Sequence, residues 1–173
     1  MKTFYIKLVF AFFVVCTIAS CKLDAPIYPS DVKAIDPVDN TPSVNDGTGL
    51  PIGDANNIQV KIGDITYIFN NAAAFNVLPA GTTGFANGQT TLAAEGATAD
   101  AKGILVFPSA ASGTFDLSDM EAGNFRIDIS AQAKVIVTVL NEINTQGTFS
   151  CDMIDKSSNK VYKHCLGSFN INK

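Results

Sequence analysis

Two cysteines near the end of the chain, Cys151 and Cys165, have a spacing that would allow a disulfide bond between them. A polar stretch between them, from Asp155 to Val161, has the composition of a hairpin turn. If Asp155 and Val161 close that hairpin, antiparallel pairing places Cys151 directly opposite Cys165. Directly opposed residues have Cβ atoms about 4.5–5.5 Å apart, so a disulfide bond is feasible. The spacing predicts a structural disulfide; two buried thiols, or a register shifted by one residue, are the alternatives.

The same register places His164, the one histidine of the chain, opposite Asp152. A histidine beside a carboxylate is a common acid–base pair, but catalysis also needs a nucleophile and oxyanion donors aimed at one point. The sequence contains no G-x-S-x-G, H-E-x-x-H or phosphate-binding motif. It also lacks the C-x-x-C motif of a redox pair. We therefore interpret the two residues as an exposed cross-strand charge pair and predict no catalytic residue.

The acidic residues in the first third of the chain invite a calcium interpretation, but their spacing does not fit. The calcium loop D-x-D-x-D-G has Glu at its twelfth position, which here is Gly47 counted from Asp36 and Asn57 counted from Asp46. The chain has 12 Lys and Arg against 16 Asp and Glu, a net charge of −4, which disfavours binding to nucleic acid. The sequence predicts no metal, no cofactor and no nucleic-acid partner.

A third cysteine, Cys21, follows a segment with the features of a signal peptide. After two early lysines, the uncharged run Leu8–Ile18 is shorter than the roughly 20 residues that span a bilayer. The run ends in Ile18-Ala19-Ser20-Cys21, which resembles the lipobox of bacterial lipoproteins. That resemblance implies cleavage before Cys21 and attachment of lipid to its thiol, with acyl chains such as palmitate that hold the protein at a membrane.

Cys16 is a weaker candidate for lipid attachment, because Val14 and Val15 precede it where a lipobox has small residues. An ordinary secretory signal that ends in a chance cysteine is the other interpretation of the segment. Removal of residues 1–20 takes two lysines with it and makes the net charge more negative by two. Anionic lipid surfaces repel an acidic body, so the lipid on Cys21 would have to hold it at the membrane.

The stretch from Cys21 to Asn56 differs in composition from the rest of the chain. It contains five of the seven prolines and six aspartates, and its apolar residues follow no period. Because proline removes backbone donors and blocks helix, we expect a flexible, disordered linker in solvent. The predicted organisation is a signal peptide over 1–20, a lipid-anchored linker over 21–56 and a folded domain over 57–173.

The predicted domain consists of short runs in which apolar and polar residues alternate, separated by Gly, Asn and Asp. Ten runs are candidate strands: Ile58–Ile62, Ile65–Phe69, Ala74–Leu78, Thr90–Ala94, Ile104–Phe107, Thr114–Leu117, Phe125–Ser130, Lys134–Leu140, Thr148–Ile154 and Val161–Asn170. Asn71–Ala74 and Ser118–Ala122 are interpreted as single turns, and no stretch has a helical stripe. The pattern predicts an all-β fold, an antiparallel β-sandwich of about eight to ten strands, with a small barrel as the alternative.

Two glycine–aromatic motifs carry a resemblance to a known family. Gly147-Thr148-Phe149-Ser150 and Gly167-Ser168-Phe169-Asn170 resemble the closing hairpin of small Bacteroidota-type lipoproteins of unknown function. Lys61-Ile62-Gly63-Asp64 and the segment 112–117 also match the layout of that family. The resemblance implies a β-sandwich on a lipid anchor and no catalytic residues. The chain departs from the family by having Tyr67 where Trp is usual and by its two hairpin cysteines.

These observations together favour a non-enzymatic binding or accessory module, anchored by lipid in the outer membrane of the cell envelope. Its loops would meet a glycan, a peptide or an envelope protein. A structural envelope-assembly lipoprotein that pairs through a strand edge, and a hydrolase, are the alternatives. A pocket with convergent polar groups favours the first, an unprotected edge strand the second, and a cleft with two carboxylates the third.

Overall fold

The computed structural model describes residues 44–98 and 101–173 of the chain. They belong to one compact unit, Thr41–Lys173. The predicted signal peptide, Cys21 and the first part of the predicted linker lie outside the described residues. The described part contains no helix that is long and apolar enough to cross a membrane.

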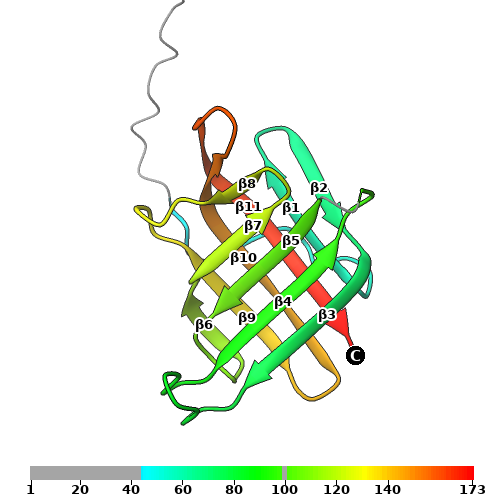
Figure 1. The fold of residues 1–173 in the computed structure, drawn as a ribbon, viewed down its shortest axis with the longest axis vertical. Helices are drawn as coiled ribbons and strands as arrows, with labels where there is room; N and C mark the ends of the chain where they lie inside the picture. Colours follow the sequence, from blue (N-terminus) through cyan, green and yellow to red (C-terminus); the bar gives the residue numbers. More distant parts are fainter. Residues whose placement is uncertain (1–43, 99–100) are drawn as a thin grey trace, which may run out of the picture. The chain divides into compact units, whose positions relative to one another are not determined.

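The described residues of this unit form eleven antiparallel strands and no helix; Figure 1 shows their arrangement. They are β1 (Asn57–Ile62), β2 (Ile65–Phe69), β3 (Asn71–Leu78), β4 (Gln89–Glu95), β5 (Lys102–Phe107), β6 (Gly113–Asp116), β7 (Asp119–Ala122), β8 (Phe125–Ile127), β9 (Lys134–Leu140), β10 (Asn144–Asp155) and β11 (Val161–Asn172). The prediction of an all-β antiparallel sandwich is therefore confirmed, with one strand more than the ten candidates.

The strands form two layers that pack face to face and share β10. One layer has the order β2-β1-β11-β10-β9-β6; the other, β8-β7-β5-β4-β3, lies in front in Figure 1. Strand β10 connects the layers because its first half pairs with β9 and its last three residues pair with β8. The strand order thus nearly closes on itself; its main path ends at β2 and β3, and the branch through β9 ends at β6.

Aromatic rings fill the space between the layers. Phe107 on β5 stacks with Phe169 on β11, with 6.4 Å between the ring centroids. Towards the β10–β11 turn, Phe125 contacts the rings of Tyr67 and Tyr162 edge-on, at 5.4 Å and 5.6 Å. The two tyrosines therefore pack against the core, and each is only partly buried.

Two segments interpreted as turns are strands. In β7 (Asp119–Ala122), Met120 and Ala122 are buried and the strand pairs with β5, so alternation over four residues is enough once a partner strand lies beside it. Strand β3 begins at Asn71 rather than after a turn, and a bulge between Asn71 and Ala74 interrupts its pairing with β4. Ala72 in this bulge has a φ of 48°, which is a left-handed conformation. Alanine rarely adopts this conformation, so the sequence of the segment does not predict the bulge.

Residues 44–56, which we call the strap, lie against the body and do not form part of a solvated linker. The amide of Leu50 donates to the carbonyl oxygen of Gly167 on β11, at 3.2 Å. Gly49 lies so flat on the strands that a Cβ there would collide with the same carbonyl oxygen. The expectation of a disordered linker up to Asn56 is therefore wrong for the strap, because proline and aspartate composition does not reveal contacts with strands about 100 residues away.

Candidate functional site

The two glycine–aromatic motifs pair with each other across the β10–β11 hairpin. Gly147 lies opposite Phe169, and Phe149 lies opposite Gly167. A Cβ on Gly147 would lie 2.6 Å from the Cζ of Phe169, and a Cβ on Gly167 would overlap the ring of Phe149. Each ring thus covers the glycine of the facing strand, so the spacing of these motifs has a packing role.

The next opposed pair along the same face is Cys151 and Cys165, as the sequence predicts. Both side chains are buried in the core, but they are free thiols and the predicted disulfide is not formed. The Sγ of Cys165 instead donates to the carbonyl oxygen of Tyr162, at 3.4 Å. Burial raises the pKa of both thiols, that of Cys165 to about 12. Neither is a thiolate at neutral pH, so the pair is chemically inert in this state.

The hairpin reaches this cysteine pairing by a different route from the predicted one. Its last strand pair is Ile154 opposite Val161, and the amide of Asp155 then donates to the carbonyl oxygen of Lys160, so Val161 pairs one residue away from the expected Asp155. A bulge between the Met153 and Cys151 pairs then shifts the register back, and His164 in this bulge has a φ of 51°. The predicted opposition of Cys151 and Cys165 is confirmed, whereas the closing pair assumed for it is wrong and the predicted disulfide is not formed.

Asp152 is buried beside this bulge, with 3% of its surface exposed. Its Oδ1 accepts hydrogen bonds from the backbone amide of His164 and from the Nδ2 of Asn45, both at 2.9 Å. The imidazole of His164 is exposed, and its Nδ1 lies 3.3 Å from the Oδ1 of Asn45. The expected exposed charge pair is therefore wrong for Asp152, which holds the bulge and the strap. We call Asn45, Asp152 and His164 the clasp.

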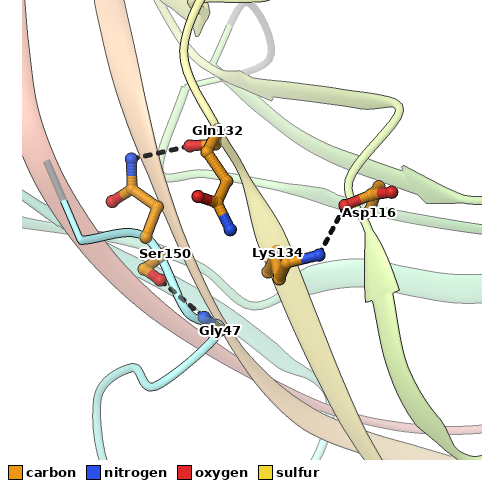
Figure 2. Close-up of polar contacts among 6 residues, drawn as sticks. Gly47, Asp116, Gln132, Lys134 and Ser150 are labelled. Atoms are coloured by element: carbon orange, nitrogen blue, oxygen red, sulfur yellow. Dashed lines mark hydrogen bonds and ion pairs between the residues drawn. The ribbon is translucent and has the colours of Figure 1, made fainter.

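Further hydrogen bonds tie the strap to the outer face of the hairpin. Figure 2 shows the amide of Gly47 donating to the Oγ of Ser150, at 2.8 Å. The Oγ1 of Thr148 donates to the carbonyl of Gly47 at 2.8 Å, and the Oγ of Ser168 donates to the carbonyl of Pro51 at 3.0 Å. These side chains are polar and yet buried or half-buried, because the strap covers them. The sequence analysis did not identify the residues of the strap, including Asn45, as part of the site, because their hydrogen-bond partners are remote in the chain.

The Nδ2 of Asn45 also donates to the carbonyl of Gln132, at 2.8 Å, so the start of the strap is fixed to the loop before β9 as well. Just beyond that loop, Lys134 and Asp116 form an ion pair at 2.7 Å between β9 and β6 (Figure 2). This pair is partly exposed and contributes little to stability. In the clasp, by contrast, Asn45 and Asp152 are buried, and their hydrogen bonds connect segments from three parts of the chain.

A pocket of about 400 Å³ lies where β3 ends beside the β9–β10 turn. Its lining is four apolar side chains and three polar ones: Val77, Pro79, Ala110, Leu140, Asn141, Glu142 and Lys173. This volume is within the range of small-ligand sites. Beside it, Ile143 is 70% exposed in the β9–β10 turn. Sequence reasoning missed this pocket because its residues come from segments that are far apart in the chain.

A second pocket, of about 220 Å³, lies between the end of β6 and the loop before β9. It is lined by Asp116, Leu117, Ser118, Ile127, Ile129, Ala131, Gln132 and Ala133. Each of the two pockets has one carboxylate in its lining, whereas glycoside hydrolysis usually needs two that flank the substrate. Neither lining therefore supplies the pair that the hydrolase alternative requires.

Within the described ranges, no three His, Cys, Asp or Glu side chains lie close enough together to hold a metal ion. Comparison of the chain with protein-family models, with curated proteins and with solved structures gave no match. The function must therefore be inferred from the geometry of the strap, the hairpin and the pockets.

Proposed function

We propose that this chain is a lipid-anchored outer-membrane lipoprotein whose β-sandwich is a non-enzymatic binding or accessory module. The observation that carries the proposal is the strap. The segment that follows the proposed tether is fixed to the body through Asn45, which bonds to Asp152 and Gln132, before the first strand begins. Such a join suits a body that is presented from a tether, because the end of the tether is fixed at one place on its surface.

The reactive side chains of the C-terminal hairpin support a non-enzymatic role. Asp152 accepts two hydrogen bonds that hold the strap and the bulge, and Cys151 and Cys165 are buried thiols whose pKa is raised by burial. The ring of His164 is exposed, and its Nδ1 lies beside the amide oxygen of Asn45. These groups serve the fold, which leaves the pockets and loops for binding.

The pocket beside the β9–β10 turn supports a binding role. Apolar side chains such as Val77 and Leu140 form part of its lining, and Asn141, Glu142 and Lys173 add one amide and two opposite charges. This combination suits a short peptide or a glycan, whose apolar surface and polar groups would both find partners. We therefore propose this pocket as the place where the ligand binds.

Lipid attachment is tested by replacing the proposed anchor residue. In cells supplied with labelled palmitate, we expect Cys21→Ala to lose the label and to leave the membrane fraction, because the thiol that takes the lipid is absent. Cys16→Ala is the matched control and should behave as the wild type. If Cys21→Ala keeps both the label and the membrane location, the proposed anchor is wrong.

Binding is tested by a photoreactive amino acid placed at Asn141 in the full-length protein. We expect irradiation of intact cells to give a defined adduct from this position, because Asn141 lines the pocket. The same amino acid at Asp119, an exposed position on β7, is the matched control and should give none. Equal adducts from both positions, or none from either, would contradict the proposed binding site.

A structural role in envelope assembly is the second candidate function. The observation that favours it is the end strand β2, on which Ile65 and Ile68 are 59% and 49% exposed. Apolar side chains on an end strand are a typical docking feature for another chain.

A further inference from the structure

The main strand order of the sandwich ends at β2 and β3, and the branch through β9 ends at β6, so each of these three strands pairs with one neighbour. Strand β6 has four residues and ends in Asp116, whose charge is paired with Lys134 on β9. Among the described strands, β2 pairs with β1 and β3 pairs with β4. Each therefore has one edge without a strand partner, along which backbone amides and carbonyls can bond to another chain. Proteins usually protect such edges with charges, prolines or bulges.

The two end strands differ in how they are protected. Strand β3 has the bulge between Asn71 and Ala74, and the Nζ of Lys173 lies 4.8 Å from the centroid of the Phe75 ring on this strand. A bulge and a lysine are both features that oppose pairing with a further strand. The bulge interrupts the regular pleat of β3, so an added strand could not pair regularly along its whole length.

Strand β2 has none of these protective features. Its five residues contain no charge and no proline, and its pairing with β1 runs through five consecutive pairs without a bulge. The uncharged stretch around it is long, since no charged residue occurs between Asp64 and Glu95. Ile65 and Ile68 are nevertheless 59% and 49% exposed. The strand is thus a regular, apolar edge that is open to pairing.

We propose that two copies of this chain associate through β2, with the two strands antiparallel and a two-fold axis at Tyr67. This register places Thr66 opposite the partner's Ile68, and Ile65 opposite the partner's Phe69. It keeps the alternation of the sheet, in which Thr66 and Ile68 point away from Tyr67 and Phe69. The two layers of each copy therefore do not have to change in order to pair.

A second copy fits this edge better than a charged peptide does. Identical antiparallel strands can pair without repulsion only if no like charges face each other, and β2 has no charge at all. A charged peptide would find no opposite charge on β2 to select it. Lys61, the closest charge on β1, pairs with Thr66 and stays two strands away from the second copy.

The contact is short, so the dimer is expected to be weak. Five residues from each copy bury less than the roughly 800 Å² per partner of a standard stable interface. Association should therefore depend strongly on concentration. This inference is independent of the proposed lipid anchor, because β2 lies in the described body.

The register is tested by cysteine cross-linking of the full-length chain in mild detergent. In Thr66→Cys/Ile68→Cys, each new thiol faces the other type of new thiol on the second copy, so mild oxidation should give a covalent dimer. The matched control is Ala74→Cys/Asn76→Cys, at two exposed positions on β3. We expect the β2 pair to give at least about tenfold more covalent dimer than the control.

The affinity is tested by sedimentation velocity over a range of concentrations, with unfolding temperatures measured for every variant. Ile68→Lys should weaken dimerisation about tenfold or more, while Ala74→Lys on β3 should leave it unchanged. Both positions are exposed, so both variants should keep the unfolding temperature of the wild type. The proposal is overturned if the wild type is a monomer at every concentration, if Ile68→Lys dimerises equally well, or if cysteines on β2 cross-link in cells to other proteins alone.

Discussion

The two faces of the β10–β11 hairpin are both covered, but by different means. The inner face is covered by the other layer and contains Phe149, Met153 and Phe169, which are fully buried. The outer face contains Ser150 and Asp152, which are buried because the strap lies over them. The inner face excludes water through the fit of aromatic rings to glycines, and the outer face does so through hydrogen bonds.

This difference predicts which cover opens first. Separating the apolar layers exposes large hydrocarbon surface to water, which costs roughly 25 cal/mol per Å². Lifting the strap exchanges its hydrogen bonds for bonds to water, and each such exchange costs only about 1 kcal/mol. We therefore expect the strap to open locally while the two layers stay closed.

The largest effect is expected from the inner face. Phe149→Ala should lower the free energy of unfolding by about 3–5 kcal/mol, because it removes a fully buried ring and leaves Gly167 uncovered. Denaturant unfolding of the two proteins measures this. Ile129→Ala, at a side chain that is 86% exposed, is the control and should change it by less than about 0.5 kcal/mol. A similar small loss for Phe149→Ala would contradict the packing role of the glycine–aromatic pairs.

The clasp should give the next largest effect. Asp152→Ala leaves the amide of His164 and the Nδ2 of Asn45 without this acceptor, so we expect a loss of about 2–3 kcal/mol. Protease should also cut the strap faster in this variant. Asp119→Ala removes an exposed carboxylate from β7 and is the matched control. If the two variants unfold alike, the clasp does not hold the strap.

A single hydrogen bond to the middle of the strap should matter less. Ser168→Ala removes the donor to the carbonyl of Pro51 and one acceptor of the Nε2 of Gln59, but Gln59 still donates to Pro51, so the variant should cost about 1 kcal/mol. Hydrogen exchange should become faster at the amide of Leu50, which bonds to the neighbouring Gly167. An unchanged exchange rate at Leu50 would show that the strap does not open as one unit.

The tip of the hairpin should show a small dependence on pH. Hydrogen bonds from the hydroxyl and the amide of Ser157 lower the pKa of Asp155 from its ordinary value of 3.8 to about 2. A lowered carboxylate pKa stabilises the fold above about pH 4, and this contribution is lost as the pH falls towards 2. The unfolding temperature should therefore drop over this interval in the wild type and drop less in Asp155→Ala. If the unfolding temperature falls equally with pH in both proteins, Asp155 is not the group responsible for the acid sensitivity.

The two cysteines of the inner face should react slowly with alkylating reagents as long as the protein is folded. Because burial raises the pKa of both thiols, alkylation of the native protein at pH 8 should be slow at Cys151 and Cys165. After unfolding without reductant, mass spectrometry should find both thiols alkylated, as the free thiols of the structure require. If neither is alkylated until reductant is added, the predicted disulfide forms in the protein after all.

Alternation and turn composition predicted most of the fold from local sequence. They identified ten strands and the Cys151–Cys165 pairing, but they placed the hairpin turn one residue away from its position. The bulge at His164 shifts the strand register by one residue and so restores the pairing of the two cysteines. The residues next to His164 in the sequence do not predict the bulge, because the carboxylate of Asp152 on the facing strand holds it. Strand β7 was missed for a related reason: four alternating residues with two carboxylates indicate a strand only beside β5.

The clasp was harder to predict than the fold. Asp152 and His164 were identified as neighbours from the register, whereas Asn45 lies in a proline- and aspartate-rich stretch whose composition is typical of a linker. Its partners Gln132 and Asp152 are 87 and 107 residues away. The composition of a segment indicates whether the segment can form a hydrophobic core of its own. It does not indicate whether the segment packs against the surface of a folded domain.

The strap also determines how a pulling force would enter the body. Tension along the chain from its N-terminal side reaches the hydrogen bonds of Asn45 first and would peel the strap from the hairpin one bond after another. The 13 residues of the strap, fully extended, span roughly 40 Å, and this length is drawn out before β1 is loaded. The strap would therefore detach under tension before any strand does. It would bind to the hairpin again when the force is released, while the sandwich stays folded.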